Sequence, residues 1–284
     1  MDEPEIRPSN WSPLIANIVA LSSLLVVAVF LMRSGEPDRP DADSQTVQAE
    51  TTSPVSDTEA EPAPPAPMLI EESAGTSVLG RDIPLARWGS GPTILIMASI
   101  HGTESAGTHL VQRLKSLLDE KAEDFPNDRQ VVLMPLVNPD GVNSKQRGNA
   151  NGVDLNRNFP AENRQNSKRY GLTALSEPEA LAIYQVIEKF QPVRIVTLHE
   201  PLRCVDYDGP GLELATAMAE VCPLPVKKLG TRPGSMGAFT GEARQIPTIT
   251  LELPRDAKMK TADELWELYG EAMLLAVRHP IDGK

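Results

Sequence analysis

The residues 94–105, ILIMASIHGTES, combine an uninterrupted apolar run with two polar side chains that suit a metal ion. The stretch 93–98 is almost wholly apolar, as in strands of a parallel sheet that is covered on both faces. His101 follows this strand, and Glu104 stands three residues later, where we predict that a helix begins. Imidazole and carboxylate are zinc ligands, and a catalytic zinc ion takes three ligands from the protein. The stretch therefore predicts a buried strand with part of a metal site at its end.

Short apolar runs alternate with helical patterns from about Gly75 to the C-terminus, which predicts an α/β fold in a single domain. We expect strands at 83–88, 93–98, 130–137, 193–198 and 247–253, and helices at 104–118, 177–190, 212–221 and 262–278. Ser176 precedes the second of these helices and has Glu179 three residues later. Thr261 and Glu264 have the same spacing at the last helix, so we predict a capping box at both. Ligands of open α/β sheets bind beyond the carboxyl ends of the strands, and we expect the site there.

The chain has only four histidines, which narrows the search for a third metal ligand. Two of them, His109 and His279, fall within or at the end of a predicted helix, where a surface position is the simpler interpretation. His199 ends a predicted strand, as His101 does. This shared position makes His199 the candidate for the third ligand.

Glu200 stands next to His199 and could be an alternative ligand or a partner of one. Adjacent residues on an extended chain point to opposite faces, so we leave Glu200 out of the predicted set. The predicted set is His101, Glu104 and His199, which together would hold one zinc ion.

Five motifs of the chain resemble, in order and spacing, those of the zinc carboxypeptidase family. They are His101-Gly-Thr-Glu104, Asn138-Pro-Asp-Gly141, RGNANGVDLNRNFP at 147–160, His199, and TLELP at 250–254. The resemblance runs from about Gly75 to the C-terminus. It implies a mixed central sheet with helices on both faces, one bound zinc ion and hydrolysis of a peptide bond.

The resemblance also implies a role for individual residues. Glu252 matches the family's catalytic general base, and burial at the end of an apolar strand is expected to raise its pKa. Arg147 matches the arginine that stabilises the oxyanion. Asn156 and Arg157 match the pair that binds the substrate's terminal carboxylate, for which the planar guanidinium is suited. The segment 138–141 is expected to form a tight turn.

The chain departs from the digestive members of the family at 237–241, where it reads GAFTG and has no tyrosine. The segments 75–89, 206–210, 232–236 and 250–254 instead resemble an amidase branch, which cleaves the γ-D-glutamyl–diaminopimelate bond of cell-wall peptides. That bond is the predicted substrate. Three alternatives stay open: a carboxypeptidase with ordinary C-terminal substrates, a deacylase of N-acyl amino acids resembling desuccinylases and aspartoacylases, and a non-catalytic module that binds the cell wall.

The N-terminal quarter of the chain differs from the rest in charge. Residues 1–75 contain thirteen acidic residues and three arginines, a net charge of −10 out of the chain's −12. The remaining domain is nearly neutral and has no cluster of basic residues, which argues against a nucleic-acid partner. The two cysteines, Cys204 and Cys222, could form a disulfide or remain thiols.

Residues 14–32 are nineteen consecutive uncharged residues, long enough to cross a membrane as a helix. A cleaved signal peptide would have a shorter apolar run and a small-residue cleavage site, which is missing here. Residues 33–74 are rich in proline and acids, which predicts a disordered linker. We expect a tail at 1–13, a single-pass membrane anchor at 14–32, this linker, and a catalytic domain at 75–284. A short tail before one anchor favours a domain outside the cytoplasm, although the basic residues are too few to fix the orientation.

Overall fold

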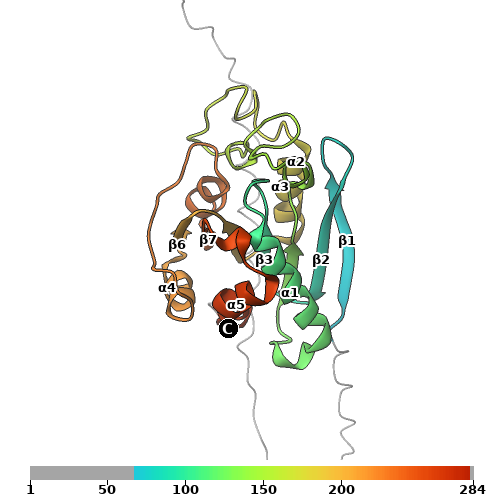
Figure 1. Ribbon diagram of the computed structural model, residues 1–284, viewed down its shortest axis with the longest axis vertical. Helices are drawn as coiled ribbons and strands as arrows, with labels where there is room; N and C mark the ends of the chain where they lie inside the picture. Colours follow the sequence, from blue (N-terminus) through green and yellow to red (C-terminus); the bar gives the residue numbers. More distant parts are fainter. Residues whose placement is uncertain (1–66, 282–284) are drawn as a thin grey trace, which may run out of the picture. The chain divides into compact units, whose positions relative to one another are not determined.

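A seven-stranded mixed sheet forms the centre of the computed structural model, which describes residues 67–281. The strands are β1 (Leu69–Thr76), β2 (Asp82–Gly89), β3 (Thr93–Ala98), β4 (Gln130–Met134), β5 (Arg194–His199), β6 (Leu202–Asp208) and β7 (Thr248–Pro254). Their order across the sheet is β1-β2-β4-β3-β5-β7-β6 (Figure 1). The four central strands are parallel, whereas β2, β1 and β6 are added by antiparallel pairing. The predicted α/β domain with a mixed sheet is confirmed.

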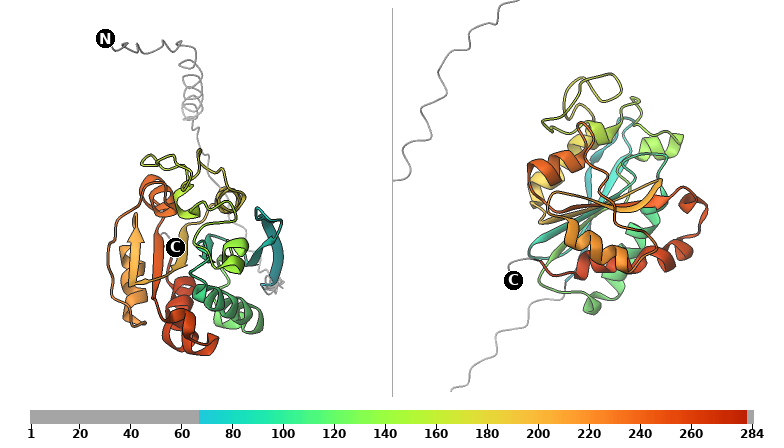
Figure 2. Two further views of the ribbon diagram at one scale, coloured as in Figure 1. Left: turned by 45° about the horizontal axis from the view of Figure 1, so that its top comes forward. Right: turned by 90° about the vertical axis from the view of Figure 1, so that its left-hand side faces the viewer.

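Helices cover both faces of this sheet. They are α1 (Ala106–Glu120), α3 (Pro178–Phe190), α4 (Leu212–Glu220) and α5 (Ala262–Arg278), with the shorter α2 (Pro139–Ser144) and the π-helical turn η3 (Ala238–Ala243). The helices α1, α4 and α5 pack together on one face, and α3 lies on the other (Figure 2). The sheet is therefore the middle layer of a three-layer domain.

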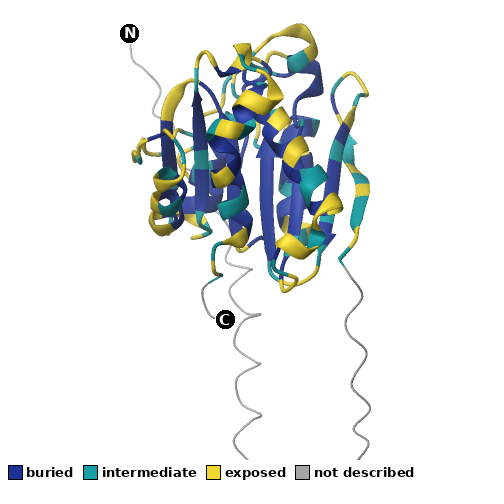
Figure 3. Ribbon diagram, turned by 60° about the horizontal axis from the view of Figure 1, so that its bottom comes forward, coloured by how far each residue is buried: buried dark blue, intermediate teal, exposed yellow. Residues whose placement is uncertain are grey.

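The strand β3 shows why the central strands are apolar throughout. Ile94 and Ile96 pack toward α1 and α5, while Leu95 and Met97 pack on the opposite face toward α3. Every residue of β3 is buried, and the central strands are buried along their length in Figure 3. Alternate residues of a strand point to opposite faces, so a strand with two covered faces has no polar side.

The helix α1 begins at Ala106, two residues later than predicted, so Glu104 lies in the loop before it. Ser105 occupies the N-cap position without a hydrogen bond from its side chain. Instead, the Glu200 carboxylate accepts a hydrogen bond of 3.0 Å from the amide of Ala106. A carboxylate from the loop after β5 thus caps this helix and interacts favourably with its dipole.

The two predicted capping boxes have different outcomes. At Thr261 and Glu264 the reciprocal hydrogen bonds are present, at 3.2 and 2.7 Å, and α5 has the predicted bounds. At Ser176 and Glu179 the prediction is wrong, because α3 follows Glu177 and no side chain caps it. The Glu179 carboxylate accepts hydrogen bonds from an asparagine and a backbone amide far away in the sequence instead.

Two edge strands, β1 and β6, were not predicted from the sequence. The sheet begins at Leu69, so the domain start expected at Gly75 is six residues too late, and the end of the expected linker belongs to the sheet.

Cys204 is buried within β6, and both it and Cys222 are free thiols. The expected anchor at 14–32 lies outside the described residues. Between residues 67 and 281, no helix has the length and apolarity needed to span a bilayer.

The segment 138–141 is the start of a helix and not the predicted tight turn. Asn138 caps α2 by accepting a hydrogen bond of 2.9 Å from the amide of Gly141. The backbone of Gly102 lies directly against the first turn of α2, and a Cβ at Gly102 would collide with the backbone of Gly141. Glycine at this position lets the loop that contains His101 pack against α2.

Candidate metal centre

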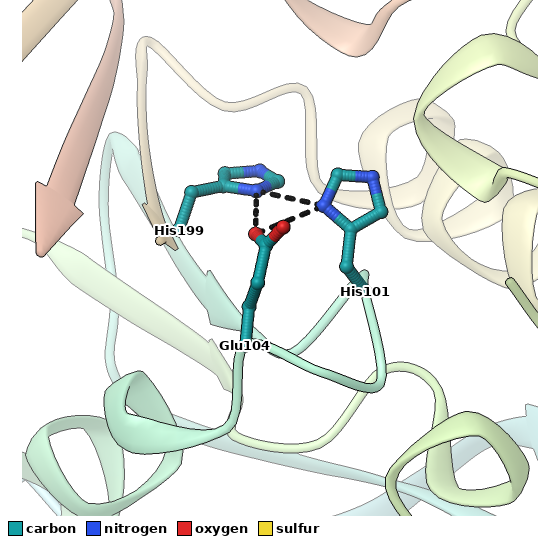
Figure 4. A group of neighbouring side chains, drawn as sticks. All are labelled: His101, Glu104 and His199. Atoms are coloured by element: carbon teal, nitrogen blue, oxygen red, sulfur yellow. Dashed lines mark hydrogen bonds and ion pairs between the residues drawn. The ribbon is translucent and has the colours of Figure 1, made fainter. Parts of the chain in front are cut away.

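The three predicted ligands come together at the carboxyl edge of the central strands. His101 follows β3, Glu104 lies in the same loop before α1, and His199 is the last residue of the neighbouring strand β5. In Figure 4 the three side chains point toward a common centre. Within residues 67–281, this is the one group of three or more His, Cys, Asp or Glu side chains close enough together to hold a metal ion.

The distances within this group fit a metal ion. The Nδ1 atoms of His101 and His199 both lie 2.9 Å from Oε2 of Glu104 and 3.2 Å from each other. All three side chains are buried. Ligand atoms about 2.0–2.1 Å from a tetrahedral zinc ion would lie about 3.3 Å apart, close to the spacing found here. Two imidazole nitrogens and a carboxylate oxygen are zinc ligands by type, and the three residues could therefore bind one zinc ion.

Asp154 is the neighbour that orients His101, a role that no motif of the sequence indicated. Its Oδ1 lies 3.0 Å from Nε2 of His101, and its Oδ2 accepts a hydrogen bond of 3.0 Å from Arg147. The contact fixes the ring so that Nδ1 faces the other two ligands, as partners of metal-binding histidines commonly do. Asp154 lies within the quoted motif at 147–160, but no spacing rule places it beside a residue 53 positions away.

The electrostatics of the group favour ionised carboxylates. Burial alone would raise the pKa of Glu104, but hydrogen bonds from His101 and His199 hold that pKa far below its usual value. The pKa of Asp154 is likewise lowered against the effect of burial, mainly by His101 and Arg147. Both acids thus remain negatively charged, which suits ligation of a cation.

Replacing Asp154 with Asn is expected to weaken zinc binding about 10- to 100-fold, because the partner that orients and polarises His101 loses its charge. Competition with a chromogenic chelator would measure the zinc affinity. Asp119→Asn, on an exposed part of α1, is the matched control and should keep the original affinity. An unchanged affinity in Asp154→Asn would show that His101 needs no such partner.

Arg147 is tied to the ligand group by two of its nitrogens. Its Nη1 donates a hydrogen bond of 2.6 Å to Oε1 of Glu104, in addition to the contact with Asp154. The side chain is 40% exposed and borders the pocket. Arg147 therefore brings positive charge to the rim of the metal site.

Asn156 and Arg157 also line this pocket. The side-chain oxygen of Asn156 accepts a hydrogen bond of 2.9 Å from the amide of Met236, which ties the loop before η3 to the site. Burial lowers the pKa of Arg157, and the positive charges of Arg147 and Arg232 lower it further. The negative charge of Asp154 opposes these effects. A guanidinium crowded by other cations is suited to bind an anionic group.

Glu252 lies on β7 directly opposite His199 in the sheet register. Its side chain is largely buried, and its Oε2 accepts a hydrogen bond of 3.2 Å from the amide of Leu202. Burial raises the pKa of Glu252, while His199 partly opposes this effect. The expected desolvation of this carboxylate is confirmed.

These residues surround one pocket of about 400 Å³. The three ligands, Arg147, Asn156, Arg157 and Glu252 all border it, so the structure brings every sequence-predicted site residue together. The pocket is also lined by four charged residues outside the predicted set, Glu200, Asp206, Asp208 and Arg232. A second hollow, of about 300 Å³, lies at the opposite edge of the sheet, beside Val193 and Pro247, and contains none of the predicted ligands.

The His–Glu–His group at the carboxyl edge of the parallel central strands is the arrangement expected of the zinc site in a hydrolase of the carboxypeptidase type. The zinc carboxypeptidase family model matches residues 67–206, and the chain belongs to this family. It is similar to murein peptide amidase A of Escherichia coli K12, with 35% identity over 236 residues that cover 74% of this chain and 91% of that protein.

Two further relatives agree with this assignment. Murein peptide amidase A of Vibrio campbellii is 34% identical, over 76% of this chain and 90% of that protein. The crystal structure of murein-tripeptide amidase MpaA from Escherichia coli O157 superposes with a TM-score of 0.60 at 32% identity, covering 77% of this chain and 94% of that one. The chain is thus a metallopeptidase that is similar to these amidases along most of their length.

Proposed function

We propose that this protein is a zinc-dependent amidase that hydrolyses the bond between γ-D-glutamate and diaminopimelate in murein peptides. One observation carries the proposal: the chain matches murein peptide amidase A over 91% of that protein's length. The pocket supports it, because metal ligands, a buried carboxylate and several arginines lie around one cavity.

A zinc ion held by His101, Glu104 and His199 would lower the pKa of a water molecule and polarise the scissile carbonyl. Glu252 stands beside His199, where its carboxylate can take a proton from the attacking water. The same carboxyl group then gives that proton to the leaving nitrogen as the C–N bond breaks. The amide of Leu202 holds one oxygen of Glu252 and so fixes the direction of the other.

The arginines of the pocket interact with the negative charges of the substrate. Arg157 and Asn156 bind the carboxylate of the residue that is released, since the guanidinium can donate two parallel hydrogen bonds. Arg147 stabilises the negative charge that develops on the carbonyl oxygen. Its contacts with Glu104 and Asp154 hold it beside the metal ligands.

Hydrolysis of L-Ala-γ-D-Glu-diaminopimelate by the purified full-length protein tests the proposal, with product release followed by chromatography. We expect diaminopimelate to appear, and Arg157→Lys to raise KM more than it lowers kcat, because Lys cannot bind a carboxylate with two parallel bonds. Arg113→Lys, on an exposed part of α1, is the matched control.

Two other substrates separate the remaining alternatives. Cleavage of an ordinary C-terminal α-peptide, with the tripeptide left intact, would indicate a general carboxypeptidase. Cleavage of an N-acyl amino acid alone would indicate a deacylase. Retention on the cell wall without hydrolysis of any of these substrates would overturn the enzymatic proposal.

A further inference from the structure

Two acidic residues of β6 lie on the same face of the sheet as Glu252 and border the pocket. The strand β6 pairs with β7 so that Cys204 faces Glu252, Asp206 faces Thr250, and Asp208 faces the next alternate residue of β7. Alternate residues of a strand share a face and are about 7 Å apart. Asp206 and Asp208 therefore lie one and two such steps away from the level of Glu252, and both border the pocket.

Asp208 is the acid whose hydrogen bonding is incomplete. The residue is 6% exposed, and its buried Oδ1 atom has no hydrogen-bond partner among residues 67–281. Asp206, by contrast, accepts a hydrogen bond of 2.8 Å from the amide of Leu229. A buried carboxylate oxygen without a donor costs free energy, so a donor supplied by a ligand would stabilise it.

Glycine at position 237 lets the carboxylate of Asp208 pack closely against the backbone. A Cβ at Gly237 would collide with the carboxylate of Asp208. Gly237 also borders the pocket, directly after the segment 232–236 that resembles the amidase branch. A side chain at this position would have to displace the carboxylate, so glycine at 237 lets Asp208 keep its place at the pocket.

The charges around Asp208 favour a cationic ligand. Burial, together with the negative charges of Asp206 on the same strand and Glu242 on η3, raises the pKa of Asp208 to about 7. Lys228 acts in the opposite direction, although it also lies 3.5 Å from Glu242. An added positive charge beside Asp208 would relieve this repulsion and favour its ionised form.

We propose that Asp208, assisted by Asp206, binds an ammonium group on the side chain of the residue that hydrolysis releases. The carboxylate of that residue would meet Arg157 and its ammonium group would meet Asp208, which both border the same pocket. The residue selected is thus an amino acid with a terminal amine on a chain of several carbons, such as diaminopimelate or lysine. This inference rests on the proposed function, because it concerns the specificity of the same pocket.

Binding of free amino acids to the zinc-loaded full-length protein tests the inference without requiring turnover. Isothermal titration calorimetry would compare lysine with norleucine, which has the same carbon chain but lacks the amine. We expect lysine to bind about 10- to 100-fold more tightly than norleucine. A hydrogen bond between the ammonium group and a buried carboxylate contributes a gain in affinity of this size. Asp208→Asn should bring the two affinities to within about threefold, whereas Asp119→Asn should keep the preference.

The pH dependence gives a second readout on the unaltered protein. The ratio of the lysine and norleucine affinities should rise as pH increases through about 7, because protonated Asp208 attracts an ammonium group less. The ammonium group of lysine keeps its charge over this range. Comparing the two ligands cancels ionisations elsewhere in the site that affect both equally.

The outcomes separate this inference from the proposed function. Equal binding of lysine and norleucine by the unaltered protein would overturn the inference, even if the protein hydrolyses the murein tripeptide. A preference for lysine that disappears in Asp208→Asn would support it, even if the tripeptide stays intact. In that second case, the proposed murein substrate would be wrong and another amine-bearing residue would be the one recognised.

Discussion

Replacing Glu252 with Gln is expected to lower kcat about 10²- to 10⁴-fold, the usual contribution of a positioned general base. The amide of glutamine is nearly the same size as the carboxylate and can still accept the hydrogen bond from Leu202, so the pocket should keep its shape. It cannot accept a proton from water, however. Steady-state hydrolysis of the murein tripeptide, together with zinc content by elemental analysis, would measure both effects.

Glu220→Gln provides the control, because this exposed residue of α4 lies outside the pocket. It should retain full activity. A Glu252→Gln variant that binds zinc and still works within about threefold of the original rate would exclude the proton-transfer role. Loss of zinc from Glu252→Gln would instead show that the carboxylate belongs to the metal site.

Removing the metal is expected to abolish hydrolysis and to lower stability. A ligand that binds only the folded state stabilises it by about 4 kcal/mol when its concentration is 1,000 times its Kd. Chelation should therefore lower the free energy of unfolding by about that amount, relative to protein at a zinc concentration about 1,000 times its Kd. His199→Ala removes one of three ligands and should weaken zinc binding by more than about 100-fold, beyond the effect expected for a neighbour such as Asp154.

Urea unfolding with and without zinc would measure the stability change, and hydrolysis assays would measure the loss of activity. His109→Ala is the matched control, since His109 is exposed on α1 and does not line the pocket. Its zinc-linked stabilisation should equal that of the original protein. Activity that survives both thorough chelation and His199→Ala would contradict a zinc-dependent mechanism.

The sequence predicts best where one local pattern decides the structure. The bounds of β3 and α5 are as predicted, because an apolar run buried on both faces and a capping box are both short-range signals. The metal ligands were also found together as predicted. His101 and His199 each follow or end a central strand, and parallel strands place such residues at the same edge.

Long-range contacts decide what the sequence did not reveal. The strands β1 and β6 lie at the edges of the sheet and contain acids that hide the alternation of apolar residues. Glu179 has the spacing of a capping residue, yet its carboxylate is engaged by a distant asparagine. Asp154 and Asp208 gain their significance from residues more than 25 positions away, His101 and Gly237, which no local pattern can indicate.

The carboxylate of Glu200 has a consequence for how the metal is acquired. It caps α1, while the amide of the same residue donates a hydrogen bond of 3.2 Å to Oε2 of Glu104. These two contacts join the loop with two ligands to the end of the strand with the third, and neither contact involves the metal. Part of the entropy lost in ordering the ligands is thus offset by folding itself, which favours tight zinc binding.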